Sequence, residues 1–230
     1  MNLPDAYQLR SISLEIEGHS FRLSLVSNAD ALLDRLLAKG EEHEDVVDER
    51  IPYWADLWPS AIALSRYLVR EELAGPGMEV LEIGCGLALP GIVAGRLGAR
   101  VTLSDYQEEA LLLARHNWSQ NQVGAAAFRQ MDWRAPDPAL AADLVLASDV
   151  AYEARAFAPL ARAFQTLCRP GGSLLLAEPN RAIARPFLDA LQLDGFDKRH
   201  AVVTGRYDDL DYGVNIYHFF SRRPSKKPGA

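Results

Sequence analysis

The sequence predicts an α/β fold: a doubly wound, mostly parallel sheet of seven strands with helices on both faces and a β-hairpin extension at the N-terminal end. Two observations lead to this class. Short apolar runs alternate with segments of helical periodicity from about residue 61 onward, which is the order of elements in a parallel sheet. The run Asp143-Leu-Val-Leu-Ala-Ser148 is continuously apolar in its middle, as expected of a strand that helices cover on both faces.

The predicted elements follow in order along the chain. Alternating segments on either side of Gly18-His19 predict the hairpin, and residues 31–38 a short amphipathic helix. Strands are expected at 79–83, 101–104, 126–131, 143–148, 173–178, 200–204 and 214–220, and helices at 61–72, after Pro90, and at 108–118, 154–167 and 182–193. Arg169-Pro-Gly-Gly172 should break the chain ahead of the fifth strand, and the last two strands should form an antiparallel pair.

This reading divides the chain into three parts. Residues 1–50 hold the hairpin and the short helix, and residues 51–221 form the main domain. Residues 222–230, which contain four basic side chains and two prolines, are expected to be a flexible tail.

Composition excludes several classes of function. The formal charge of -7 argues against a nucleic-acid partner. No apolar run reaches the roughly 18 to 20 residues of a membrane span, and the N-terminus lacks the pattern of a signal peptide, so we expect a cytoplasmic protein without a membrane partner. Cys85 and Cys168, the two cysteines, are expected to be unpaired. The five histidines show no metal-ligand spacing, which predicts no metal site.

The segment Glu79-Val-Leu-Glu-Ile-Gly-Cys-Gly-Leu-Ala-Leu-Pro-Gly91 reads as a strand, a glycine turn and the start of a helix. Gly84 and Gly86 permit a tight turn beneath a ligand, with Cys85 between them. Asp105 ends the next strand, about 20 residues past the glycines, where a carboxylate can take both hydroxyls of an adenosine ribose. Together they predict a site for an adenosine cofactor; for the turn alone, a simple tight connection is the alternative.

Two positions bear on which cofactor this is. A dinucleotide fingerprint needs a third glycine, but Leu89 stands at that place. Glu82, two residues before Gly84, would repel a pyrophosphate, whereas it suits a cofactor that carries an ammonium and a sulfonium. The pattern therefore favours S-adenosylmethionine over NAD.

Three aromatic residues and one acid lie in Pro52-Tyr-Trp-Ala-Asp-Leu-Trp-Pro59, just before a predicted helix. An aromatic ring close to a sulfonium would stabilise it by about 0.5 to 2 kcal/mol, and Trp58 is the candidate for this contact. The alternative is that these tryptophans dock the N-terminal element on the core.

Two further strand ends supply candidates at the same sheet edge. After the third strand, Asp132 could accept a hydrogen bond from the exocyclic amine of adenine and Trp133 could cover the ring; a loop cap with a packed tryptophan is the alternative. After the fourth strand, Asp149 is the best catalytic candidate, because a carboxylate there can hold an incoming amine and stabilise the charge it gains. Tyr152 could add a hydrogen bond or a ring face; a capping aspartate and a core tyrosine are the alternative.

With these residues in view, the sequence resembles a class I, seven-β-strand S-adenosylmethionine-dependent methyltransferase from about Tyr53 to Phe220, and more narrowly the methyltransferase-like lysine methyltransferases of methyltransferase family 16. The most specific motif is Asp149-Val-Ala-Tyr152, the Asp-x-x-Tyr of that family. The resemblance implies a Rossmann-like sheet and cofactor contacts from Trp58, Glu82, Gly84, Gly86, Asp105, Trp133, Ser148 and Tyr152. It also places Asp149 and Tyr152 at the substrate mouth. Members often carry a third glycine where this chain has Ala88.

The resemblance implies an S-adenosylmethionine-dependent N-methyltransferase that acts on a lysine side chain of a protein by direct in-line transfer. Two alternatives stay open. One is an enzyme for a small-molecule amine, in which the acidic stretch at 41–49 helps to form a lid; the other is a non-catalytic protein that binds S-adenosylmethionine. An NAD-dependent hydride transferase is a more distant alternative.

Overall fold

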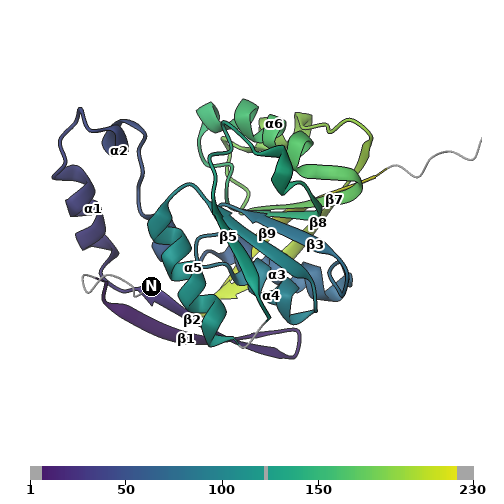
Figure 1. Ribbon diagram of the computed structural model, residues 1–230, viewed down its shortest axis with the longest axis horizontal. Helices are drawn as coiled ribbons and strands as arrows, with labels where there is room; N and C mark the ends of the chain where they lie inside the picture. The colour runs from purple at the N-terminus through teal and green to yellow at the C-terminus, as the bar shows by residue number, and fades with distance from the viewer. Residues whose placement is uncertain (1–6, 122–123, 222–230) are drawn as a thin grey trace, which may run out of the picture.

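The computed structural model describes residues 7–121 and 124–221, and its central feature is a sheet of seven strands in the order β5-β4-β3-β6-β7-β9-β8 (Figure 1). The parallel strands are β3 (Glu79–Ile83), β4 (Arg100–Asp105), β5 (Ala126–Gln130), β6 (Ala142–Ser148) and β7 (Cys168–Glu178). β9 (Leu210–Ser221) runs antiparallel to both β7 and β8 (Phe196–Tyr207). The chain order reverses between β3 and β6, and ligands of doubly wound sheets bind at the carboxyl ends beside such a switch point.

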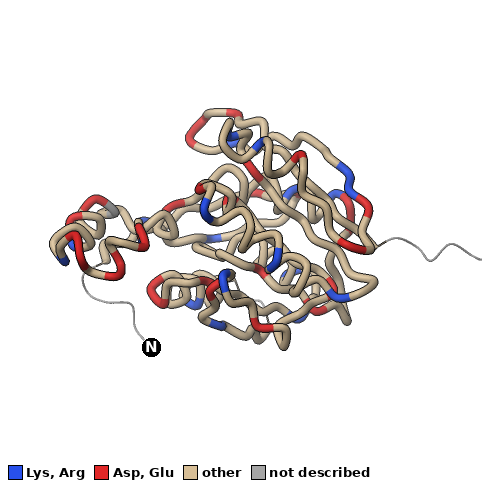
Figure 2. Tube along the Cα trace, turned by 90° about the horizontal axis from the view of Figure 1, so that it is seen from above, with Lys and Arg blue, Asp and Glu red and all other residues tan. Residues whose placement is uncertain are grey.

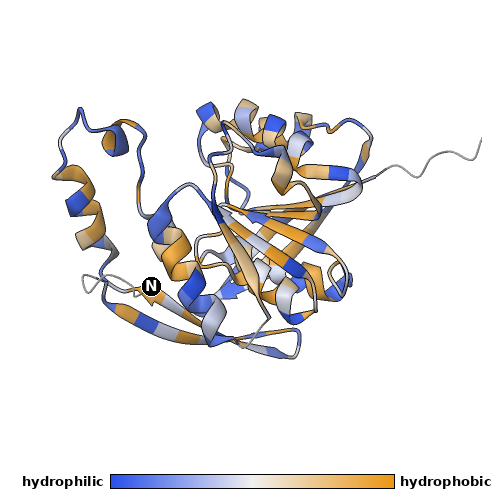
Figure 3. Cartoon of the chain, viewed as in Figure 1, coloured by the Kyte–Doolittle hydropathy of each residue, from blue (hydrophilic) through white to orange (hydrophobic). Residues whose placement is uncertain are grey.

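The two faces of the sheet bury separate apolar layers, because successive side chains of a strand point in opposite directions. On β6, Leu144 and Leu146 pack into one layer while Val145 and Ala147 pack into the other. The apolar colouring in Figure 3 follows the central strands and the helices that cover them. This double burial is the reason that β6 reads as a continuous apolar run.

Helices cover both layers. The face that holds Leu144 is covered by α3 (Pro59–Arg70), α4 (Leu89–Arg96) and α5 (Glu108–Gln120), and the opposite face by α6 (Phe157–Leu167) and α7 (Arg185–Ala190). Single 3-10 turns lie at Tyr53–Ala55, Pro138–Leu140 and Ala154–Ala156. Helices α3 and α4 carry a proline in the first turn, where the chain needs no backbone N–H donor.

The N-terminal hairpin, β1 (Leu9–Ile16) and β2 (His19–Val26), packs on α5. Asn117 of α5 and Asn121, the C-cap of α5, make this contact specific: Asn121 Oδ1 accepts a hydrogen bond of 2.9 Å from the N–H of Arg22. The N–H of Ser24 donates to Oδ1 of Asn117 over 2.7 Å, and Asn117 Nδ2 donates back to the Ser24 carbonyl over 3.1 Å. Because Asn117 is fully buried, each of these hydrogen bonds satisfies a polar group that would otherwise be costly.

Past the hairpin, α1 (Ala29–Leu37) and α2 (Glu44–Val47) form an arm beside the sheet. Figure 2 shows acidic positions gathered on this arm. The apolar side chains of the hairpin join the same buried cluster as α3 and α4. The predicted boundary between residues 50 and 51 therefore stays a prediction, as does the tail at 222–230, which lies outside the described residues.

The fold class and the hairpin extension are confirmed, and four details differ from the prediction. Helix α7 is shorter than expected, since residues 181–184 turn before it and Leu191 is extended after it. The segment at 169–172 is not a break: β7 begins at Cys168, with an irregular register against β6. β8 and β9 are longer than predicted because they pair with each other along their whole length. The short helix α2 was not predicted. No helix in the described ranges combines the length and the apolar character that a membrane crossing requires.

One glycine of α4 tests how closely this helix must approach the sheet. A Cβ on Gly91 would lie 2.4 Å from Cδ2 of Leu103 and 2.6 Å from Oε2 of Glu82, both of which are fully buried. Helix propensity alone favours Ala over Gly by about 1 kcal/mol, but overpacking of a core costs about 1 to 3 kcal/mol. We expect Gly91→Ala to lower the free energy of unfolding by about 1 kcal/mol or more in urea denaturation. Gly75→Ala, whose Cβ meets nothing within 4 Å, is the matched control and should show no such loss.

Candidate active site

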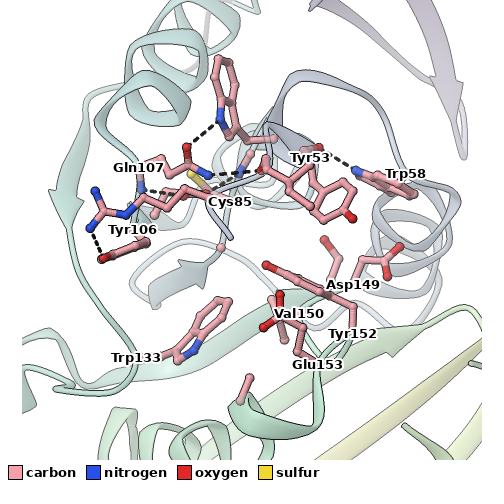
Figure 4. Close-up of a pocket in the computed structure, with 18 of the residues that line it drawn as sticks. Tyr53, Trp58, Cys85, Tyr106, Gln107, Trp133, Asp149, Val150, Tyr152 and Glu153 are labelled. Atoms are coloured by element: carbon pink, nitrogen blue, oxygen red, sulfur yellow. Dashed lines mark hydrogen bonds between the residues drawn. The ribbon is translucent and has the colours of Figure 1, made fainter. Parts of the chain in front are cut away.

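A cavity of about 490 Å³ lies at the carboxyl ends of the parallel strands, where the switch point predicts a ligand site. Its walls come from segments that are distant in sequence: 48–58, 84–89, 105–107, 132–134, 148–156 and Arg181. In Figure 4, Trp133 lies at one end of the cavity, and Asp149, Tyr53 and Trp58 lie at the other. All the candidate residues from the sequence except Glu82 line this cavity.

The glycine turn forms the floor beside β3. Gly84 and Gly86 have φ values of 59° and 46°, in the left-handed region that favours glycine. A Cβ on Gly84 would lie 3.0 Å from Val150 and 3.3 Å from Trp133. Ala88 also has a positive φ, 66°, and is the N-cap of α4. The turn therefore keeps its shape without the third glycine, at a cost of about 1 to 2 kcal/mol.

Glu82 lies beneath the turn rather than in the cavity wall. It is fully buried, and its Oε2 accepts a hydrogen bond of 2.8 Å from the N–H of Gly91 in the first turn of α4. Burial raises the pKa of its carboxyl well above the usual value, and the Gly91 hydrogen bond opposes that shift. Successive side chains of β3 point to opposite faces of the sheet, and Glu82 points to the face covered by α4. Its hydrogen bond from Gly91 therefore holds the first turn of α4, which follows the glycine turn.

Asp105 joins two turns at the cavity. Oδ2 accepts a 3.0 Å hydrogen bond from the N–H of Gly86, and Oδ1 accepts one of 3.0 Å from the N–H of Gln107. Burial raises the pKa of Asp105 while these backbone donors lower it. Each carboxylate oxygen has a second lone pair, so Asp105 retains acceptor capacity toward the cavity. The thiol of Cys85 lies close by, and burial raises its pKa well above the usual value, which leaves it neutral.

Asp132 and Trp133 follow β5 but behave differently. The indole of Trp133 is half-buried and lines the cavity beside Gly84. The carboxylate of Asp132 is engaged by its neighbour: Oδ2 accepts from Arg134 Nε over 2.7 Å, and Oδ1 accepts from the Arg134 N–H over 2.8 Å. The ring is therefore open to a ligand, whereas the carboxylate is already paired.

Asp149 is held in an unusual backbone conformation at the end of β6. Its φ is 61°, and its N–H donates to the carbonyl of Ala177 on β7 over 2.9 Å. Only 7% of the side chain is exposed, and Oδ2 has no hydrogen-bond partner among the described residues. Burial raises the pKa of this carboxyl. Ser148, the last residue of β6, lines the cavity next to it.

Three aromatic rings surround this end of the cavity. The ring of Tyr53 meets Tyr152 edge-on at 5.5 Å and Trp58 edge-on at 5.9 Å between centroids. Trp58 Nε1 donates to the Tyr53 carbonyl over 2.8 Å, which fixes the loop before α3 (Figure 4). Burial raises the pKa of Tyr152 to about 12, so its hydroxyl stays protonated at neutral pH. The sequence motif thus brings Tyr152 beside Asp149, and the fold adds Tyr53.

Sequence reasoning missed the contacts that close the other end. Asp48 accepts from Arg134 Nη1 and Nη2 over 3.2 and 3.1 Å, and from the Tyr106 hydroxyl over 2.9 Å. These donors lower the pKa of Asp48 to about 2. Arg50 also hydrogen-bonds Tyr106, and its guanidinium lies 4.5 Å from the ring centroid. No local motif predicts these pairs, because their members are tens of residues apart.

Arg181 is the second missed residue. It follows β7, lines the cavity and forms an ion pair with Asp149. The same argument that selected the ends of the third and fourth predicted strands would have selected this position, had it been applied to the fifth. Within the described ranges, no group of three or more His, Cys, Asp or Glu side chains is placed to hold a metal ion.

Comparison with known structures shows the same fold. The T. thermophilus 16S rRNA N2 G1207 methyltransferase RsmC, solved in complex with AdoMet and guanosine, superposes with a TM-score of 0.59 at 17% identity. The superposition covers 94% of this chain and 51% of that chain.

Two curated relatives are similar in sequence. The human histone-arginine methyltransferase METTL23 is 36% identical over 44% of this chain and 56% of its own length. The mouse EEF1A lysine methyltransferase 3 is 30% identical over 73% of this chain and 72% of its own. The chain spans about half the length of the histone-arginine methyltransferases that it matches. A model of the lysine methyltransferase family matches residues 48–193, which include every segment of the cavity wall. The chain therefore belongs to the lysine methyltransferase family.

Proposed function

We propose that this protein is an S-adenosylmethionine-dependent N-methyltransferase and that its acceptor is a lysine side chain of a protein. The observation that carries the proposal is the buried carboxylate of Asp149, whose Oδ2 is unpartnered at the end of a cavity. A lysine amine is a hydrogen-bond donor that fits this acceptor. Membership of the lysine methyltransferase family supports the same conclusion.

The cavity fits the cofactor at the adenosine end. The glycine turn presents backbone without side chains, Asp105 has free acceptor capacity for ribose hydroxyls, and the exposed face of Trp133 suits an adenine ring. We propose that the cofactor is held by Trp58, Gly84, Cys85, Gly86, Asp105, Asp132, Trp133, Ser148 and Tyr152, with Glu82 supporting the turn from beneath. When bound, S-adenosylmethionine supplies a methyl group whose bond to a positively charged sulfur breaks as the acceptor nitrogen bonds to its carbon.

The residues of this chain would act on the acceptor by positioning and electrostatics. Oδ2 of Asp149 accepts an N–H of the neutral amine, which directs the nitrogen lone pair into the cavity, and the carboxylate then stabilises the positive charge that the nitrogen gains. The protonated Tyr152 hydroxyl is available as a donor. The rings of Tyr53, Trp58 and Tyr152 offer faces to a cation, worth about 0.5 to 2 kcal/mol.

Arginine is a second candidate acceptor, and the 36% identity to a histone-arginine methyltransferase supports it. Lysine is favoured because the lysine methyltransferase relative aligns over a larger share of both chains. The net charge of -7 supports a protein over a nucleic acid as substrate. We also propose a cytoplasmic location, which the two unpaired cysteines support.

Cofactor binding can be tested by thermal denaturation with S-adenosylhomocysteine. At one hundred times the dissociation constant, a ligand adds about 2.7 kcal/mol of stability, or roughly 5 to 10 °C in Tm for a chain of this size. We expect that shift with S-adenosylhomocysteine and none with NAD. In Asp105→Ala, the affinity should fall at least about tenfold, because a hydrogen bond to a charged group contributes about 1.5 to 3 kcal/mol. A shift produced by NAD instead would refute the choice of cofactor.

The role of Asp149 can be tested by methyl labelling. The protein is incubated with radiolabelled S-adenosylmethionine and a lysate of the source cells, and proteins are separated and imaged. We expect a labelled protein band, and at least a 100-fold slower labelling with Asp149→Asn, as for the loss of one preorganised electrostatic contact. Asp189→Asn, on the exposed face of α7, is the matched control and should label normally. Label confined to small molecules would favour the metabolite enzyme, and cofactor binding without any label the non-catalytic protein.

The pH dependence of transfer tests the nature of the acceptor. A lysine side chain has a pKa near 10.4 and must lose its proton before it attacks, so the rate should rise about tenfold per pH unit from neutral to mildly alkaline pH. Tyr152, with a pKa of about 12, does not titrate in this range. Single-turnover rates with excess enzyme report the chemical step. Rates that are constant between pH 7 and 9 would contradict an amine acceptor.

A further inference from the structure

The strongest feature that the proposed function leaves unused is the ion pair between Arg181 and Asp149. Nη1 of Arg181 donates to Oδ1 of Asp149, and the guanidinium lines the cavity. Oδ2 of the same carboxylate has no partner among the described residues. The two oxygens of Asp149 are therefore different: Oδ1 is held by the Arg181 guanidinium, and Oδ2 is buried without a hydrogen-bond partner.

Arg181 is placed by its own loop. The buried carboxylate of Glu178, at the end of β7, accepts from the N–H groups of Asn180 and Arg181, each over 2.6 Å. Asn180 has a positive φ of 69°, which turns the chain back toward β6. Because Ser148 on β6 pairs with Ala177 on β7, this turn brings Arg181 beside the residue that follows Ser148. The loop thus fixes the backbone of Arg181 at a position from which its guanidinium reaches Asp149.

The charges around Asp149 make this contact significant. Burial raises the pKa of Asp149, and Arg181 lowers it. The hydroxyl of Ser60 on α3 also lowers it, although Ser60 Oγ makes no hydrogen bond of good geometry. Of the other ionisable groups, Glu178 interacts with Asp149, and Asp56, Tyr53, Tyr152, Glu153 and Arg155 line the same cavity.

A lone buried carboxylate would bind the ammonium form of an amine and raise the pKa of that amine, which opposes the loss of the proton that transfer requires. A carboxylate paired with a fixed guanidinium is neutral as a unit. It can still accept a hydrogen bond through the oxygen that has no partner, but it gives less stabilisation to a second cation. The pair is therefore suited to the neutral amine.

We infer that Arg181 is a positioning residue for the acceptor: it holds Asp149 ionised through Oδ1, leaves Oδ2 as the unpartnered acceptor for the incoming nitrogen, and balances the carboxylate so that the site favours a neutral amine over an ammonium. This inference rests on the proposed function for the amine acceptor. The effect of Arg181 on the ionisation of Asp149 can be measured without any methyltransferase activity.

The test compares Arg181→Gln and Arg181→Lys with the unmodified protein. The quantity measured is the single-turnover rate at saturating acceptor as a function of pH. Loss of the Arg181 cation should shift the rising part of this pH–rate profile to higher pH by about one unit or more. That size is the lower end of the effect of an adjacent opposite charge on a pKa. The rising part of the profile reports the pKa values of groups in the enzyme–substrate complex. If Arg181 had only a structural role, its replacement would lower the rate without shifting the profile along the pH axis. Arg181→Lys keeps the positive charge, so the rising part of its pH–rate profile should stay near that of the unmodified protein. The methyl acceptor in these assays is the protein identified from the labelled band of the labelling experiment.

A second measurement needs no acceptor. Carboxyl carbons of aspartate are labelled with ¹³C, and the signal of Asp149, assigned by its absence in Asp149→Asn, is titrated by NMR. We expect the pKa of Asp149 to rise by about one unit or more in Arg181→Gln and to stay near its original value in Arg181→Lys. Arg185→Gln removes an exposed arginine of the next turn, which binds Asn180, and is the matched control. Arg181→Met, of similar length, replaces the glutamine variant if circular dichroism shows that the latter is unfolded.

The outcomes separate the two proposals. If Arg181→Gln leaves both the pH–rate profile and the pKa of Asp149 unchanged, the inference is overturned, whether or not the protein methylates lysine. A shifted titration in a protein that labels nothing would retain the Asp149–Arg181 pair but reject both the methyltransferase proposal and the role of Arg181 in catalysis. Shifts in both measurements, absent from Arg185→Gln, are the result expected.

Discussion

The carboxylate of Asp105 is the contact on which the rest of the cavity depends. It accepts hydrogen bonds from Gly86 and Gln107, so it ties the turn after β3 to the turn after β4. Those two turns open α4 and α5, and α5 in turn carries Asn117, which holds the N-terminal hairpin. One buried acid at the end of a strand therefore sets the spacing of the strand ends as well as the floor of the site.

Much of this site was predictable because strand ends meet at one edge. Asp105, Trp133 and Asp149 each follow an apolar run, and the fold brings all three to one cavity. The orientation of Glu82 was not predictable. Successive side chains of a strand point to opposite faces of the sheet, but this pattern does not say on which face the following helix begins. Arg181 was missed for a different reason. The end of the fifth predicted strand points to this region, but the turn at Asn180 that brings Arg181 beside Asp149 leaves no pattern in the sequence.

Ion pairs close both ends of the cavity, and in each an arginine reaches a carboxylate from a different segment. At one end Arg134 binds Asp48, and at the other Arg181 binds Asp149. The first pair is partly exposed, with 49% of the Arg134 side chain and 28% of the Asp48 side chain accessible, so salt screens it and it contributes little to stability. The second is mostly buried, so its electrostatic effect on a neighbouring group is strong. Similar residue pairs thus serve different purposes because their solvent exposure differs.

The position of β9 in the sheet has a consequence for synthesis on the ribosome. Among the described strands β9 comes last in sequence, yet it lies between β7 and β8. Until it emerges, the outer edge of β7 has no neighbour and β8 has no place in the sheet, although the parallel strands are already complete. An unpaired, apolar strand edge is a template for association with other chains. A stalled or truncated product that lacks β9 would therefore be a target for chaperones and proteases.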